Sequence, residues 1–226
     1  MSDRPSAPRP IAPPAFVSAV EADDRAAVDA ALAGDRALAH AATDDGTSLV
    51  LHARYRFALA ALGGLLAARG DDLDLFEAAA VDRPDVVARH LAADPSLATA
   101  FAPDGFTALQ LASFMGSLGS VRALVDAGAE IEAVSRNPMA IRPLHASAAG
   151  RHLEISRLLV GRGADVDAVQ RDSFTPLMAA AQHGDEPLAE LLLAAGADRS
   201  ARTDGGSSAA DLAAASGHEG LAARLR

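Results

Sequence analysis

Short segments of the chain place apolar residues three and four positions apart, and turn residues separate one segment from the next. In one clear segment Ile155 is followed by Leu158 and Leu159, and a run of Ala at 179–181 forms a more compact apolar stretch. Apolar residues at these spacings share one face of an α-helix. The pattern predicts pairs of short helices, an Ala-rich first helix and an amphipathic second helix, joined by a turn.

The predicted pairs repeat along the chain with a nearly constant period. Thr107, Arg142, Thr175 and Ser208 occupy equivalent positions, and the spacings between them are 35, 33 and 33 residues. Each unit begins near such a position, and three of the units close with Gly-Ala, at 128–129, 163–164 and 196–197. A helix pair of this length cannot bury its apolar face alone, so stacking of neighbouring pairs must create the core.

These motifs resemble those of the ankyrin repeat family, which has a period of about 33 residues and the signature Thr-Pro-Leu-His followed by Ala. The resemblance runs from about Pro14 to Arg226. It implies an all-α fold, an ankyrin-repeat α-solenoid of helix-turn-helix units with β-hairpin fingers. We expect the Pro-rich residues 1–13 to form a disordered tail ahead of this single domain. About seven units are expected including caps, at about 14–47, 48–72, 73–106, 107–141, 142–174, 175–207 and 208–226.

Several residues have physical roles in this interpretation. The Thr175 hydroxyl can cap a first helix by accepting a bond from a free backbone amide. Gly128, Gly163 and Gly196 can adopt the left-handed conformation that ends a second helix. The resemblance implies that the imidazole of His145 bonds neighbouring backbone.

The chain also departs from the family pattern. Arg142 stands where the capping Thr is expected, Arg151 stands where a turn Gly is expected, and the finger at 135–141 carries a two-residue insertion. We expect these departures to change local geometry and to leave the fold intact. Pro84 and Pro187 fall in the first turns of second helices, where Pro starts a helix and does not break it.

The composition suits thin, closely stacked helical layers. Half of the residues are apolar but only 4% are aromatic, and the 56 Ala residues make up about a quarter of the chain. Ala lets helices approach closely while filling little volume, which suits a stack of repeats better than one thick core. In the last unit the spacing turns Leu221 and Leu225 inward, as a terminal cap requires.

The charge and the missing residue types exclude several classes of function. A net charge of −10 opposes binding to nucleic acid, and the absence of Cys removes disulfide and thiol chemistry. No segment has the character of a signal peptide or a membrane span. All 20 basic residues are Arg, which together with the Ala content is typical of a GC-rich genome. We therefore expect a bacterial, cytoplasmic protein that binds neither nucleic acid nor membrane.

No catalytic motif is present in the sequence. It contains neither Gly-x-Ser-x-Gly nor His-Glu-x-x-His, and without Lys it cannot form a phosphate loop of the Gly-x-x-x-x-Gly-Lys kind. The seven His residues do not cluster, and we interpret His145 and His152 as structural rather than as a metal pair. The acid pairs at 23–24, 44–45 and 71–72 are interpreted as turns and helix caps. We expect no cofactor and no metal.

The candidate site is the concave surface that the resemblance implies, formed by the fingers and the exposed sides of the first helices. For a surface it carries an unusually apolar set of residues, with Phe and Met gathered on three adjacent units. The predicted partner-binding residues are Tyr55, Arg56, Val81, Phe106, Phe114, Met115, Met139, Ile141, Arg171, Asp172, Phe174, Gln182 and His183.

Two structural interpretations of this set stay open. In one, the finger aromatics Phe106 and Phe174 fold inward and are buried on the helices below. In the other, the set forms a contiguous apolar groove with a polar rim, a feature that usually marks a binding site.

Three functions are compatible with the sequence, and the absence of catalytic motifs favours the first. It is a non-catalytic protein–protein interaction module that binds an unidentified partner protein on the concave face as a monomer. The alternative is an enzyme or small-molecule-binding protein that uses the groove around Phe114, Phe174 and His183. The third is a structural homo-oligomer in which the apolar face pairs with itself.

Overall fold

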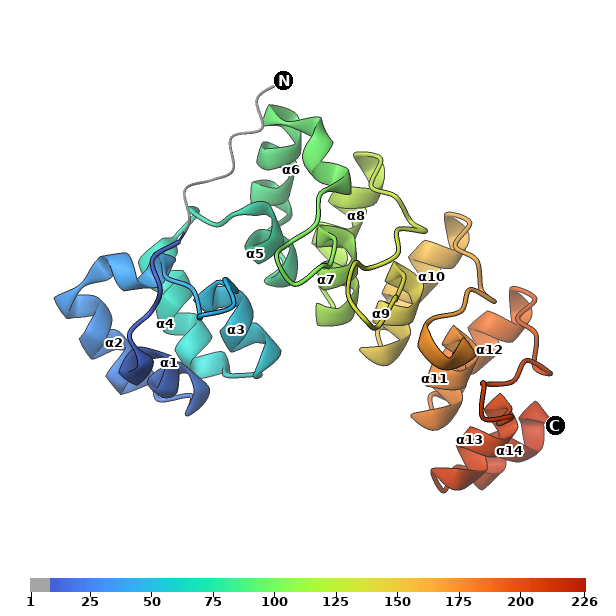
Figure 1. The fold of residues 1–226 in the computed structure, drawn as a ribbon. Coiled ribbons are helices and arrows are strands. Elements are labelled where there is room, and N and C mark those ends of the chain that lie inside the picture. Colours follow the sequence, from blue (N-terminus) through green and yellow to red (C-terminus); the bar gives the residue numbers. More distant parts are fainter. Residues whose placement is uncertain (1–8) are drawn as a thin grey trace. The chain divides into compact units, whose positions relative to one another are not determined.

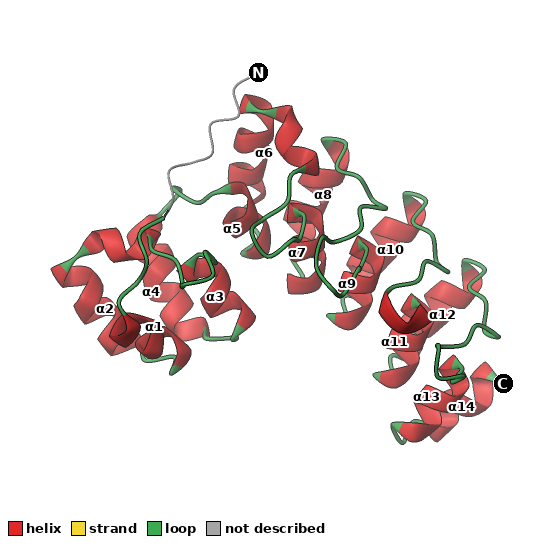
Figure 2. Ribbon diagram, in the orientation of Figure 1, coloured by secondary structure: helices red, strands yellow, loops and turns green. Residues whose placement is uncertain are grey.

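The predicted helix pairs are present, one pair in each predicted unit, and the predicted fold class is confirmed. The computed structural model describes residues 9–226, and in this part of the chain fourteen α-helices alternate with turns (Figure 2). The first helices are α1 (Pro14–Glu21), α3 (Leu49–Tyr55), α5 (Leu75–Ala80), α7 (Ala108–Met115), α9 (Pro143–Ala149), α11 (Pro176–Gln182) and α13 (Ala209–Ala215). The second helices are α2 (Arg25–Gly34), α4 (Leu59–Arg69), α6 (Pro84–Ala93), α8 (Leu118–Asp126), α10 (Leu153–Gly161), α12 (Glu186–Ala194) and α14 (Glu219–Leu225). Three short 3-10 helices complete the set, η1 (Arg36–His40), η2 (Pro95–Thr99) and η3 (Arg171–Ser173).

The chain divides into two compact units, and the boundary falls inside α5, after Ala78. In the first unit α1 packs against α3 and α2 packs against α4. In the second unit the first helices form a continuous row, α7 against α9, α9 against α11 and α11 against α13 (Figure 1). The second helices form another row, made by α6, α8, α10 and α12. The second unit therefore consists of two helical layers.

Ala and Leu build the core of the second unit in a repeating way. The first helices contribute small residues such as Ala146 and Ala180, which are fully buried and let neighbouring first helices approach closely. The second helices contribute Leu124, Leu159 and Leu192 at equivalent positions, and all three are fully buried. The same two residue types therefore fill the same two layers in successive repeats.

Among the described residues, each predicted β-hairpin finger has at most one antiparallel bridge, and the finger at 133–141 has none. Phe101 pairs with Thr107 and Arg202 pairs with Ser208, and among the described residues no pairing extends into a strand. Each finger turns back within a few residues, so it is too short to add further ladder pairs.

The helix ends follow the sequence-based expectations. The Thr175 hydroxyl accepts a bond from the Met178 amide at 3.3 Å. Gly128, Gly163 and Gly196 have φ angles of 88°, 91° and 96°, the left-handed conformation expected after a second helix.

Two second helices are capped from the preceding repeat. In the first unit the Asp23 carboxylate accepts a bond from the Ala61 amide in α4 at 2.8 Å. In the second unit the Asp82 carboxylate accepts one from the Ser120 amide in α8, also at 2.8 Å. These amides lie in first helical turns, where backbone donors lack partners within the helix. Neighbouring repeats are thus joined by capping bonds in addition to apolar packing.

The two positions at which Arg replaces the residue of the family pattern change only the local geometry. Arg142 makes no side-chain cap and instead donates from Nη1 to the Val169 carbonyl at 2.9 Å. Arg151 occupies the turn with a φ of 60°, so a residue with a side chain adopts the conformation that Gly tolerates best.

The predicted disordered tail covers residues 1–13, of which residues 1–8 lie outside the described part of the chain. Residues 9–13 are described and pair with other parts of the chain. The Ala12 amide donates to the Ala42 carbonyl at 2.8 Å, and the Ala42 amide donates to the Pro10 carbonyl at 2.9 Å. Backbone pairing with the first finger therefore fixes the position of residues 10–12.

Arg9 also joins an ionic cluster in the first unit. Its guanidinium lies 2.8 Å from Glu77, a carboxylate with no solvent exposure, and Arg69 donates to the same carboxylate at 2.7 Å. Burial alone would raise the pKa of Glu77, but Arg9 and Arg69 hold it below its ordinary value. Burial raises the pKa of the neighbouring Asp74.

Candidate functional site

The third residue of a first helix supports the finger beside it. Gln110 Nε2 donates to the carbonyls of Ala133 and Ile141, at 2.8 Å in both cases. In the next repeat His145 accepts a bond from the Arg142 amide at Nδ1, so Nε2 carries the proton that is donated to the Phe174 carbonyl at 3.3 Å. The implied structural role of His145 is confirmed.

The His145 imidazole is 2% exposed, and burial lowers its pKa to about 4. The ring is therefore neutral at physiological pH. It acts as a hydrogen-bonding spacer between helix and finger and not as an acid–base group.

Backbone bonds link successive fingers of the second unit into a row. The Arg136 amide donates to the Gly105 carbonyl at 2.7 Å, and the Asp204 amide donates to the Asp172 carbonyl at 3.0 Å. Between them the amide of Arg171 contacts the carbonyl of Met139 at 3.4 Å. We call this row, residues 101–107, 133–141, 168–174 and 201–208, together with the exposed sides of α7, α9 and α11, the finger face.

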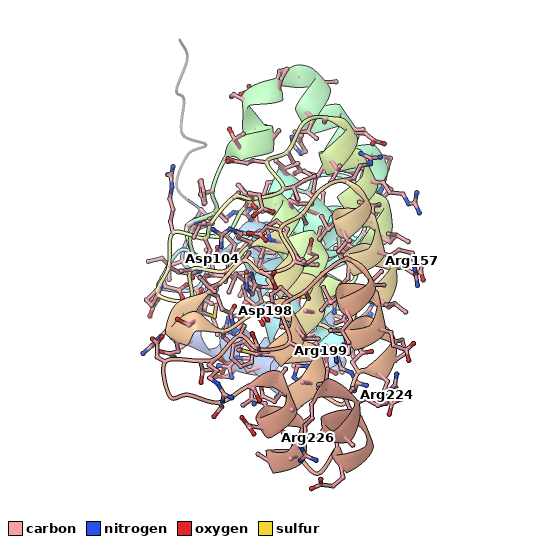
Figure 3. The ribbon with its side chains drawn as sticks, turned by 90° about the vertical axis from the view of Figure 1, so that its right-hand side faces the viewer. Asp104, Arg157, Asp198, Arg199, Arg224 and Arg226 are labelled. Carbon is pink, nitrogen blue, oxygen red and sulfur yellow. The ribbon has the colours of Figure 1, made fainter. Side chains whose placement is uncertain are left out.

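The finger face and the second helices point to different sides of the second unit. Figure 3 shows Asp104, in the first finger of the row, on one side and Arg157, in α10, on the other. Arg224, in α14, lies on the same side as Arg157 in this view. A partner bound to the finger face would therefore not cover these second helices.

The predicted apolar residues of the finger face differ in exposure. Met139 is 49% exposed and Phe114 is 38% exposed, so both present apolar surface to solvent. Phe106, Ile141 and Phe174 are half-buried. The two interpretations therefore apply to different residues, because the finger aromatics fold partly inward while Met139 and Phe114 stay accessible.

Met115 does not belong to the exposed set. It is 5% exposed, and it shares a helix face with the buried residues Leu111 and Ala112, which lie four and three positions before it. The prediction that Met115 is a surface residue is therefore wrong, because its place in α7 turns it into the core.

The predicted polar residues lie at the surface. In the second unit Arg171, Asp172, Gln182 and His183 are exposed, and Arg171 Nε lies 3.7 Å from an Asp172 oxygen. Val81, in the turn after α5, is half-buried.

The first unit holds the two remaining predicted residues. Tyr55 is half-buried at the end of α3, and the exposed Arg56 donates to Glu21 of α1 at 2.9 Å. Both belong to the first unit, so the finger face, which is defined by residues of the second unit, does not include them.

Two exposed apolar residues of the finger face were missed by the sequence analysis. Val134 is 41% exposed and Val169 is 50% exposed, and each directly follows a buried residue, Ala133 or Ala168. An extended segment alternates its side chains between two faces. Applied to the finger arms, this period of two would have assigned both Val residues to solvent.

A cleft in the first unit was also missed. It has a volume of about 420 Å³, and its lining includes Glu21, Asp44, Asp45 and His52. The 44–45 acid pair does form a turn, as expected, since Asp45 accepts bonds from the Thr43 hydroxyl at 2.6 Å and from the Thr47 amide at 3.0 Å. The cleft forms because α1 packs beside this turn, and no local sequence motif indicates that packing.

Among residues 9–226, no group of three His, Asp or Glu side chains is arranged to hold a metal ion. No helix in this part of the chain is long and apolar enough to cross a membrane.

Comparison with known proteins finds one family over most of the chain. A family model described as "Ankyrin repeats (3 copies)" matches residues 66–170 and 144–225. Ankyrin repeat and KH domain-containing protein mask of Drosophila melanogaster is 38% identical over 104 residues, 45% of this chain and 2% of that protein. Human ankyrin repeat and KH domain-containing protein 1 is 39% identical over 93 residues, 40% of this chain and 4% of that protein.

A shorter relative is protein phosphatase 1 regulatory subunit 27 of Mus musculus. It is 36% identical over 76 residues, 34% of this chain and 49% of that protein. The chain thus spans less than half the length of each of these three relatives.

Proposed function

The chain belongs to the ankyrin repeat family, and from this premise we propose that it is a non-catalytic protein–protein interaction module. The proposed binding surface is the finger face of the second unit. The observation that carries the proposal is the set of large apolar side chains exposed along one row of linked fingers and its first helix, namely Phe114, Val134, Met139 and Val169. Exposed apolar side chains gathered on one face favour a protein partner.

Energetics and a relative support this function. Fully burying one such side chain contributes about 1.5–3 kcal/mol, so burial of these side chains offsets part of the cost of association. The murine relative is named as a regulatory subunit of a protein phosphatase, a role that involves another protein. The polar rim of Arg171, Asp172, Gln182 and His183 would then select the partner rather than supply most of the affinity.

We further propose that the protein is a cytoplasmic monomer from a bacterium that binds neither nucleic acid nor membrane. The charge of −10 supports the absence of nucleic acid, and the Ala-rich, Lys-free composition supports the bacterial source. The relatives named above are animal proteins, so the bacterial source depends on composition alone.

The test compares two double variants of equal charge. Met139→Asp with Val169→Asp places two carboxylates on the finger face at sites about half exposed, where the fold is expected to tolerate them. The control, Ala88→Asp with Ala223→Asp, changes two exposed Ala residues of second helices α6 and α14. Circular dichroism melting first establishes that both variants fold.

Partners are captured from a lysate with the wild-type chain, identified by mass spectrometry and then titrated as purified proteins. We expect the control variant to bind as the wild type does and the finger-face variant to bind at least about tenfold more weakly, a loss of about 1.4 kcal/mol. A folded finger-face variant with unchanged affinity would contradict the proposed surface. Self-association of the wild type that the same variant abolishes would instead favour the homo-oligomer.

A further inference from the structure

The cleft of the first unit lies outside the finger face and combines apolar and acidic surface. Its volume is about 420 Å³, near the lower end of the range for ligand pockets. One part of the lining is apolar and comes from the N-terminal segment and α1, through Ala12, Pro14 and Val17. Another part is polar and comes from α1, the finger at 42–48 and α3.

Three carboxylates line this cleft, from Glu21, Asp44 and Asp45, and the imidazole of His52 lines it with them. Hydrogen bonds from Thr43 and Thr47 lower the pKa of Asp45, so this carboxylate stays ionised. Both bonds engage the same oxygen, Oδ1, and they hold the carboxylate in the turn. Asp44 is exposed beside it.

Glu21 connects the two first helices across the cleft. Its Oε1 lies 3.2 Å from His52 Nε2 and 2.9 Å from Arg56 Nη2. Even with the Arg56 charge included, the three carboxylates leave the lining negative. An anionic ligand would therefore be repelled, while a cation would be attracted and would find an apolar wall beside the carboxylates.

We propose that this cleft receives the side chain of an arginine within an apolar segment of the partner protein. Guanidinium donors suit carboxylate acceptors, and the methylene stem of the arginine packs against the wall formed by Pro14 and Val17. The inference deepens the proposed interaction function and depends on it, since it names the chemistry of a second contact point on the partner.

The first experiment uses a short peptide as the probe. The full ¹⁵N-labelled chain is titrated with acetyl-Leu-Arg-Leu-amide and, in parallel, with acetyl-Leu-citrulline-Leu-amide, which has nearly the same shape and no charge. We expect saturable shifts of the amide signals of Glu21, Asp44, Asp45 and His52 with the arginine peptide only. The affinity should weaken as salt is raised, because the contact is ionic and partly exposed.

Variants then locate the contact. Asp44→Asn should weaken the arginine peptide about two- to fivefold, the range expected for an exposed ion pair, and the double variant with Glu21→Gln should weaken it about tenfold. The matched control is Glu154→Gln, which removes one negative charge from an exposed position of second helix α10 and should leave the affinity unaltered.

The inference is overturned if the citrulline peptide binds equally well, if the shifts fall outside the cleft, or if Asp44→Asn and Glu154→Gln have equal effects. Its failure can be told apart from failure of the proposed function. Loss of partner binding in the Met139 and Val169 variant, together with no binding of the arginine peptide, would retain the finger face and reject the cleft. Selective binding of the arginine peptide, together with unchanged partner binding by the Met139 and Val169 variant, would retain the cleft and reject the finger face.

Discussion

A single position, the third residue of a first helix, shows how one side chain couples a helix to its finger. Gln110 and His145 occupy this position in adjacent repeats, and both donate to finger carbonyls. The family signature predicted the bonding role of His145. The degree to which burial suppresses its charge could not be predicted, because it depends on how closely neighbouring layers enclose the ring.

Replacing His145 by Gln should remove one pH-dependent part of the stability. The folded pKa of His145 is about 4 and the unfolded value is 6.5, so between these values the unfolded state binds more protons. Stability is therefore complete above pH 6.5 and decreases as the pH falls toward 4, by about 3 kcal/mol from this residue. The variant keeps an amide that can bond the finger, as Gln110 does, but it does not titrate.

Urea unfolding of the wild type and His145→Gln at pH 7 and pH 4.5 checks this. The wild type should lose about 2–3 kcal/mol more free energy of unfolding than the variant between these two conditions. An equal loss in both proteins would show that His145 titrates normally in the folded state. Carboxylates that titrate in the same range affect both proteins alike and cancel in the comparison.

At the scale of one element, the turn that joins the two helices of a repeat keeps a left-handed backbone conformation, although its residue type changes from one repeat to the next. The turn residue has a φ between 54° and 60° in four repeats, at Asp23, Phe57, Asp82 and Arg151. In another repeat Gly116 occupies the equivalent position. The Asp residues use this conformation to cap the next second helix. Phe57 is 64% exposed and gains little from burial, so it carries the backbone strain without an evident compensation.

Phe57→Gly should stabilise the chain. Relief of about 1–2 kcal/mol of left-handed strain is partly offset by the greater freedom of Gly in the unfolded state, leaving a gain of about 0.5–1 kcal/mol. The control is Leu59→Gly, two residues further on. It is similarly exposed, at 60%, but it is the first residue of α4, so Gly there should reduce stability.

Thermal and urea unfolding of the two variants gives the comparison. The expected order of stability is Phe57→Gly above the wild type and Leu59→Gly below it. A decrease in both would mean that the Phe57 ring has packing interactions that outweigh the strain.

For the whole molecule, the repeat period predicted the seven helix pairs because the same core positions recur in each unit, as Leu124, Leu159 and Leu192 show. The accessible surface was predicted less well. Counting recognition positions from the family motif included Met115, which its helix turns inward, and omitted Val169, which its finger turns outward. Such positions depend on the packing around each element, and the cleft of the first unit depends on elements that are distant in sequence.

The end of the second unit offers a test of how far stability is shared along the chain. Leu225 of α14 is 2% exposed, and its inward orientation agrees with the expected cap. Leu225→Ala should cost about 2–5 kcal/mol by leaving a cavity. Because each repeat contacts mainly its neighbours, the loss should appear first in α13 and α14 and leave α1 to α4 unchanged.

Hydrogen exchange of individual backbone amides measures this distribution. The control is Ala223→Ser, at an exposed position of the same helix, which should change stability by less than about 0.5 kcal/mol. Equal loss of protection in both units after Leu225→Ala would show that the chain unfolds as one cooperative body.

The capping bonds from Asp23 to the amide of Ala61 and from Asp82 to the amide of Ser120 affect how such a chain can be rearranged. A repeat cut at its motif boundaries would leave its cap behind in the preceding repeat and would carry its own Asp to a new neighbour. Duplication or grafting should therefore succeed best with cassettes that begin at one inter-helix turn and continue through the second helix of the next repeat. Cut in this way, the capping carboxylate and the helix that it caps are inherited together.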